Sequence, residues 1–233
     1  MPTPPNSCVF VPQCRSFPYL FTKIRDLKSS NESFAFYSSR IMTVLAEEAL
    51  GLVPSAPFPV ETPTQAMFAG TRLIEEESRL CLVSIIRAGD SLMEAARKLV
   101  PQAAVGKILI QRDESSREKL PVHYYSKLPP DIDTRFVILC DPMLGTGGSA
   151  LCALDIIVQQ GGVSPKRIVF VCVVASPEGL QALHARYPEV QVVAGAIDEG
   201  LNEEKYIMPG LGDFGDRFYN TTTSTWLKKE VEG

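Results

Sequence analysis

The sequence contains little histidine, only His123 and His184, and its six cysteines include no C-x-x-C pair. A zinc centre needs several such ligands at close spacing, so we do not expect one. Cys81, Cys140 and Cys172 lie in apolar runs instead. This placement predicts small buried side chains in a reducing compartment, and not a disulfide framework.

Long apolar runs are also missing, since none approaches the ~18 residues of a membrane-spanning helix. Residues 1–13 are rich in proline and lack the basic start and apolar core of a secretion signal. We therefore expect a cytoplasmic protein with no membrane contact. The net charge of −4 gives no broad basic surface for nucleic acid, although a small phosphate site needs only a few local cations.

What the sequence does contain is an alternation of apolar runs and amphipathic segments. Strands are predicted over 80–86, 105–111, 136–140, 167–174 and 190–194, and helices over 34–52, 90–99, 151–160 and 178–187. This order predicts an α/β fold with a mostly parallel sheet covered by helices on both faces.

The segments outside this alternation are expected to be irregular. Residues 1–22 lack periodicity and carry four prolines before Pro18, which predicts an extended N-terminal arm. Residues 23–233 are expected to form a single domain. Within that domain, residues 54–63 are interpreted as a proline-rich connector, and residues 66–77 fit neither the helix nor the strand pattern.

The most informative stretch is residues 136–150, FVILCDPMLGTGGSA. An apolar strand is followed by Asp141, a loop that contains three glycines, and Ser149 at the start of a helix. Backbone N–H groups of such a loop and helix start can hold a phosphate, and the hydroxyls of Thr146 and Ser149 add donors. The loop lacks the lysine of a Walker motif and the G-x-G-x-x-G order of a dinucleotide fingerprint. Asp141 can accept hydrogen bonds from sugar hydroxyls beside this turn, so the stretch favours a ribose 5-phosphate as the ligand. A tight turn that binds no ligand is the alternative.

Two further strands end in an arginine, at Arg87 and Arg112. Ligands of open α/β sheets bind at the carboxyl edge of the strands, where both arginines are expected. The long polar segment 112–130 predicts a β-hairpin flap over a site. We interpret His123 as a residue of this flap and not as a catalyst, because no neighbouring residue in the sequence pairs with it.

Residues 196–217, AIDEGLNEEKYIMPGLGDFGDR, are too dense in glycines and acids for a regular element. This composition indicates a pocket wall with exposed backbone donors and acceptors, which can read a small planar ring. A loop with a purely structural role is the alternative.

Together, these stretches resemble the uracil phosphoribosyltransferases. The resemblance extends from about residue 23 to residue 220 and rests on four motifs: IIRAG at 85–89, IQRDE at 110–114, DPMLGTGGSA at 141–150 and YIMPGLGDFGDR at 206–217. It implies a type I phosphoribosyltransferase fold with a small base-binding hood. It also implies transfer of a phosphoribosyl group from 5-phosphoribosyl 1-diphosphate (PRPP) to N1 of uracil, which gives UMP and diphosphate with Mg²⁺ as cofactor.

The resemblance also assigns roles to individual residues. The implied PRPP ligands are Arg87, Arg112, Asp141, Pro142, Met143, Leu144, Gly145, Thr146, Gly147, Gly148, Ser149 and Asp213. Among them, Asp141 would bind the ribose hydroxyls, residues 146–149 the 5-phosphate and the two arginines the diphosphate. Asp213 would contact PRPP, or Mg²⁺ through water, and Asp141, Arg112 and Asp213 are the catalytic candidates. The implied uracil ligands are Ile207, Gly212, Asp213 and Phe214, with Tyr206 close by.

The resemblance further implies a homodimer or homotetramer and, in some members, activation by GTP. Lys23, Arg25 and Arg40 are the candidate GTP ligands, and solvated surface charges are the alternative interpretation of the three. Two other functions stay open. One is a regulatory PRPP-binding module without catalysis, and the other is a transferase for another base, such as a purine, with a different wall at 206–214.

Overall fold

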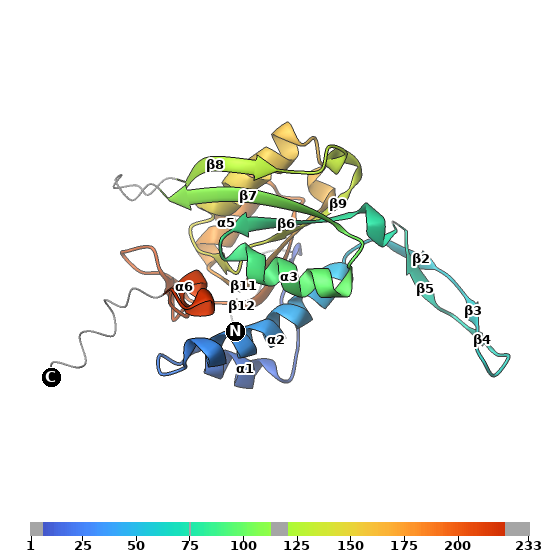
Figure 1. Cartoon of the computed structure of the whole chain (residues 1–233), viewed down its shortest axis with the longest axis horizontal. Coiled ribbons are helices and arrows are strands. Elements are labelled where there is room, and N and C mark those ends of the chain that lie inside the picture. The colour runs from blue at the N-terminus through green and yellow to red at the C-terminus, as the bar shows by residue number, and fades with distance from the viewer. Residues whose placement is uncertain (1–6, 75, 113–120, 222–233) are drawn as a thin grey trace.

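The computed structural model describes residues 7–74, 76–112 and 121–221. An eight-stranded sheet in the order β1-β12-β11-β9-β6-β7-β8, with β10 beside β11, forms its centre (Figure 1). The strands are β1 (Val9–Phe10), β6 (Leu80–Ile86), β7 (Ala104–Arg112), β8 (Pro121–Lys127), β9 (Phe136–Cys140), β10 (Met143–Leu144), β11 (Ile168–Ala175) and β12 (Gln191–Ile197). All pairs are parallel except β7 with β8, which confirms the predicted sheet.

Helices cover both faces of this sheet (Figure 1). One buried core joins the sheet to α1 (Phe17–Arg25), α2 (Asn31–Leu50), α3 (Gly89–Leu99) and α6 (Phe214–Tyr219). A second core joins the opposite face to α4 (Gly148–Asp155), its π-helical continuation η3 (Ile156–Gln160) and α5 (Pro177–Arg186). Single turns of 3₁₀ helix lie at η1 (Glu77–Arg79), η2 (Ile132–Thr134) and η4 (Pro165–Arg167).

The strands are apolar throughout because successive side chains enter different cores. Leu82 of β6 belongs to the core under α2 and α3, and Val83 belongs to the core under α4 and α5. Within the described ranges, no helix is both long and apolar enough to cross a membrane.

The expectation of an extended arm over residues 1–22 is wrong for much of this segment. Val9 and Phe10 pair in parallel with β12, and residues 17–25 form α1. Pro18 lies in the first turn of α1, where proline is well tolerated because its missing N–H has no intrahelical partner to lose. A proline at this position therefore does not exclude a helix. Residues 1–6 lie outside the described residues.

A hairpin arm extends from the body of the protein (Figure 1). In this arm, β2 (Ser55–Pro57) pairs antiparallel with β5 (Thr71–Leu73), and β3 (Val60–Glu61) pairs with β4 (Met67–Phe68). The interpretation of residues 54–63 as a connector is therefore wrong, because they form one side of the arm. The arm leaves large apolar side chains exposed, namely Phe58, Val60, Met67 and Phe68.

The strand order also determines where a ligand can bind. The chain runs from β6 through α3 to β7 on one side, and from β9 through α4 to β11 on the other. Since β6 and β9 are direct neighbours, with Ser84 opposite Cys140, the loops after them diverge from adjacent strand ends. A Cβ on Gly89 would lie 2.2 Å from the carbonyl oxygen of Cys140, so only glycine allows this close approach. Such a divergence leaves a crevice at the carboxyl edge of the sheet.

Candidate active site

A cavity of about 680 Å³ lies at this carboxyl edge. Its walls come from the ends of β6 and β7, from the loop after β9 and from residues 205–216. The structure thus brings together stretches that are far apart in the sequence. The predicted ligands that line the cavity are Arg87, Asp141, Met143, Leu144, Gly145, Gly147, Gly148, Ser149, Ile207, Gly212, Asp213 and Phe214.

The loop after β9 has the geometry of an anion site. Gly147 adopts a left-handed conformation with φ of +81°, which glycine accommodates without steric cost, and α4 begins at the next residue. The N–H groups of the first turn of α4, which have no partner within the helix, and the positive end of the α4 dipole therefore lie at the cavity wall. Thr146 does not line the cavity, and its Oγ1 accepts a hydrogen bond from the Gly148 N–H at 3.4 Å.

The start of α5 supports this loop from behind. The buried hydroxyl of Ser176 donates to the carbonyl oxygen of Gly145 at 2.7 Å and accepts from the N–H of Gly179 at 3.0 Å. The N–H of Ser176 also donates to the Leu144 carbonyl at 2.9 Å. A Cβ on Gly179 would lie 2.2 Å from the Gly145 oxygen. This support was not predicted from the sequence, in which the helix-capping Ser-Pro pair after β11 was the available signal.

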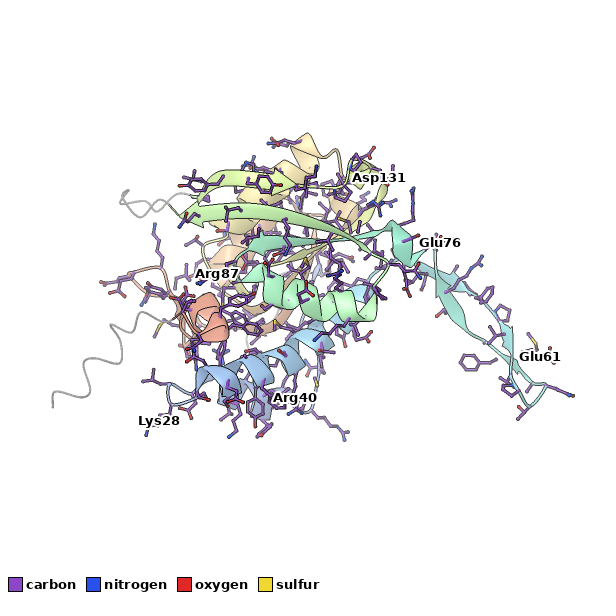
Figure 2. The ribbon with its side chains drawn as sticks, viewed as in Figure 1. Lys28, Arg40, Glu61, Glu76, Arg87 and Asp131 are labelled. Carbon is purple, nitrogen blue, oxygen red and sulfur yellow. The ribbon has the colours of Figure 1, made fainter. Side chains whose placement is uncertain are left out.

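Arg87 follows β6 through a cis peptide bond with Ile86. Figure 2 places it at the sheet edge that faces α6. Its guanidinium donates to Asp216 Oδ1 at 2.5 Å and to Thr221 Oγ1 at 2.7 Å. The Arg87 guanidinium, assisted by the Thr221 hydroxyl, lowers the pKa of the Asp216 carboxyl. Asp216 also lines the cavity, although the sequence analysis did not include it.

The predicted flap is only partly described. Its first residue, Arg112, ends β7 opposite Pro121 of β8, and residues 113–120 lie outside the described residues. The antiparallel pairing of β7 with β8 has the form of a hairpin stem. His123 lies exposed on β8. The function of this hairpin as a flap, and the role of Arg112, stay predictions.

The base wall, residues 206–214, is more regular at its edges than expected. The strands β13 (Gly200–Leu201) and β14 (Ile207–Met208) form a small hairpin, and α6 begins at Phe214. Gly210 and Gly212 between these elements have φ of +63° and +80°, which explains the glycines there. Asp213 caps α6, because its Oδ1 accepts from the Asp216 N–H at 2.8 Å.

Besides Asp216, two lining residues with polar side chains were not among the predicted ligands. They are Gln111, near the end of β7, and Lys205, at the tip of the β13–β14 hairpin, where its φ is +67°. Lys205 directly precedes Tyr206 in the sequence, which was the available signal. Tyr206 itself lines the cavity as predicted.

The three candidate GTP ligands separate into two places. Lys23 Nζ lies 5.9 Å and the Arg40 guanidinium 6.0 Å from the ring centre of Tyr37, on the outer surface of α1 and α2. Arg25 is instead engaged in a bidentate ion pair with Asp198. The assignment of these three residues to GTP stays a prediction. Figure 2 shows Arg40 well apart from Arg87, which lines the cavity.

The mostly parallel sheet, with the loop after β9 at its switch point, is the fold of the phosphoribosyltransferase class. A solved adenine phosphoribosyltransferase from Trypanosoma brucei, in complex with AMP, pyrophosphate and ribose-5-phosphate, shares this fold. It has a TM-score of 0.56 and 11% identity over 86% of this chain and 88% of that chain. A solved protein structure from Aquifex aeolicus is more similar, with a TM-score of 0.78 and 31% identity over 92% of this chain and 99% of that chain.

Sequence comparison narrows the class to one family. The family model for uracil phosphoribosyltransferase matches residues 11–221. The uracil phosphoribosyltransferase of Saccharomyces cerevisiae is 44% identical over 216 residues, which cover 93% of this chain and 97% of that protein. The uracil phosphoribosyltransferase 1 of Schizosaccharomyces pombe is 45% identical over 87% of this chain and 90% of that protein. The chain therefore belongs to the uracil phosphoribosyltransferase family, a family of pentosyl-transferring enzymes, and the resemblance seen in the sequence is confirmed.

Proposed function

We propose that this cavity catalyses phosphoribosyl transfer from PRPP to uracil. The bond between C1 of the ribose and the diphosphate oxygen breaks, a bond from C1 to N1 of uracil forms, and the N1 proton is released, which gives UMP and diphosphate. The observation that supports this reaction is the meeting of the phosphate loop and the base wall in one cavity. A Cβ built on Gly145 would lie 3.8 Å from Ile207 Cγ1, so the two walls lie next to each other.

The sugar-phosphate half of the cavity fits PRPP. The 5-phosphate would accept hydrogen bonds from residues 147–149 around the start of α4, and Asp141 would accept from the ribose hydroxyls. Arg87 and Arg112 would bind the diphosphate. Since Arg87 pairs with Asp216 in the structure, its charge would be shared between that carboxylate and the substrate.

The carboxylates of the cavity suit a magnesium ion that arrives with the substrate. Asp141 and Asp213 are hard oxygen donors in the cavity wall, and Mg²⁺ typically binds one or two carboxylates together with substrate phosphates. When bound, the ion would neutralise charge that develops on the departing diphosphate.

The base wall fits uracil through its main chain. A backbone carbonyl can accept from uracil N3–H, and backbone N–H groups can donate to its carbonyl oxygens, with Ile207, Gly212 and Phe214 as the contributing residues. Cytosine reverses part of this pattern and would leave buried groups unpaired. Asp213 is the nearest candidate base for the N1 proton. Most of the rate enhancement would come from alignment of the reactants, charge stabilisation and exclusion of water by the flap.

The experiment is an assay of purified protein with PRPP, Mg²⁺ and, separately, uracil, cytosine and hypoxanthine. UMP formed from uracil, with no product from the other two bases, is the expected result. Product from hypoxanthine would instead indicate a purine transferase. PRPP binding without any product would indicate a regulatory module.

We further propose that the chain assembles as a homodimer or homotetramer. The hairpin arm supports this proposal, because a two-stranded ribbon with exposed Phe58, Met67 and Phe68 gains stability when a second copy covers it. Sedimentation equilibrium of the wild type and of a Met67→Ser, Phe68→Ser variant tests it. A wild-type monomer at micromolar concentration would contradict it.

GTP activation is proposed for the surface of α1 and α2, where Lys23 and Arg40 lie beside Tyr37. A guanine ring could stack on the tyrosine while the cations bind the phosphates. Titration of GTP into a Lys23→Ala, Arg40→Ala variant with undiminished affinity would contradict this placement. Cytoplasmic location is also proposed, since buried free thiols such as Cys140 suit a reducing compartment.

A further inference from the structure

The base wall is hydrogen-bonded to the N-terminal part of the chain, at the last residue of α1. Arg25 extends from α1 and donates to the Gly210 carbonyl at 2.7 Å. The same guanidinium holds both oxygens of Asp198, at 2.6 and 2.9 Å. Asp198 is 5% exposed and accepts from the Gly210 N–H at 2.9 Å. Both polar backbone groups of Gly210 are therefore held by one ion pair.

A second arginine links the base wall to the same end of α1. Arg217 of α6 donates to the Leu211 carbonyl at 2.6 Å and to the Ile24 carbonyl at 2.7 Å. Its other terminal nitrogen donates to the Asp26 carbonyl at 2.9 Å. The guanidinium also lies over the ring of Phe34, 4.2 Å from the ring centre. Two consecutive wall carbonyls, at Gly210 and Leu211, thus each accept from a different arginine.

We propose that Arg25 and Arg217 are positioning residues for the base in the transfer reaction. Neither arginine lines the cavity, so they act through the backbone between Ile207 and Gly212. This inference rests on the proposed role of the base wall. A wall that recognises its ligand by backbone groups needs a fixed backbone, yet the glycines at its centre are the most flexible residues available. Arg25 and Arg217, which we call the crossed arginines, supply this restraint together with Asp198.

The variants that test this proposal are Arg25→Lys and Arg217→Lys. A lysine keeps the charge but cannot reproduce the bidentate, planar contacts of a guanidinium. Loss of one charge-assisted hydrogen bond should raise the KM for uracil about tenfold while the KM for PRPP stays unchanged. Because a stranded Asp198 carboxylate is costly, an Arg25→Gln, Asp198→Asn double variant provides a neutral pair and should give the same selective change.

Arg135 provides a matched control. It forms a bidentate pair with Asp131 at 2.8 and 2.9 Å and donates to the Ser78 carbonyl at 2.6 Å. Figure 2 shows Asp131 on the body of the protein, well apart from Arg87. Arg135→Lys should therefore lower the melting temperature but change neither KM.

The outcomes are distinct. A selective rise of the uracil KM in folded Arg25→Lys or Arg217→Lys, absent from Arg135→Lys, supports the proposal. A wild-type uracil KM in both folded variants and in the double variant, or a parallel rise of both KM values, overturns it. Gly212→Ala separates this inference from the proposed function, because it alters the wall directly. If Gly212→Ala raises the uracil KM and the arginine variants do not, the positioning role fails alone. If none of them changes the uracil KM, the base wall itself is wrongly assigned.

Discussion

Gly179 lies outside the cavity, yet replacing it with alanine should impair the use of PRPP. The new Cβ would lie 2.2 Å from the Gly145 oxygen and 2.8 Å from the Leu144 oxygen, both on the phosphate loop. An ordinary contact needs about 3.5 Å, so the loop must move by about 1 Å. A displacement of about 1 Å in a positioning element costs about 100-fold in rate, which corresponds to about 2.7 kcal/mol of transition-state stabilisation.

The assay for Gly179→Ala is kcat/KM for PRPP at saturating uracil, with thermal unfolding measured in parallel. Gly161→Ala is the control, because its Cβ would lie 2.5 Å from the Ile157 carbonyl, a clash of similar kind away from the cavity lining. Both variants should lose about 1–3 kcal/mol of stability through overpacking. Only Gly179→Ala should lose kcat/KM, and a value within threefold of wild type, with the fold intact, would refute the reasoning.

Three further predictions concern single side chains. Asp141→Asn should fold normally but reduce turnover at least tenfold through weaker ribose contacts, and unchanged PRPP kinetics would exclude that role. Arg87 holds the pKa of Asp216 below its ordinary 3.8, so their pair stabilises the fold above that pH and its contribution is lost below it. Asp216→Asn should therefore lose less stability than wild type as acid is added, and parallel denaturation curves would contradict this. At about pH 8, iodoacetamide should label Cys14 before Cys81 in peptide mass spectra, because hydrogen bonds from Ser16 lower the pKa of Cys14 and burial raises that of Cys81 to about 12. The reverse order of labelling would refute it.

The strands and helices of the body were predictable because their periodicity reflects burial on one face or on both. The prediction of a strand over 136–140 matches β9, since an unbroken apolar run is what two cores require. The helix predicted over 34–52 corresponds to α2, which spans Asn31–Leu50. It begins earlier than predicted because Ser30 caps it. The carboxyl-edge cluster followed from the same alternation, since parallel strands end together.

The remaining features of the fold and of the site depend on contacts that no local sequence pattern indicates. The arm has strands of two or three residues, which are too short for any periodicity. The pairing of Arg25 with Asp198 joins residues 173 positions apart, so the sequence offered Arg25 only as a candidate GTP ligand or a solvated surface charge. The role of Ser176 likewise required knowing that α5 abuts the phosphate loop.

The crossed arginines also impose an order on how the site is assembled. The phosphate loop, its two neighbouring strands and the supporting helix α5 all lie between residues 80 and 186, so synthesis can deliver the sugar-phosphate half as one continuous segment. The base half needs Arg25 to meet residues 198 and 210, and Ile24 to meet Arg217, across 193 positions. A ribosome must therefore produce nearly the whole chain before these partners coexist. If the base wall has the role proposed above, base selection would be the last property of the site to be completed, and a nascent chain that stops short of α6 would lack it.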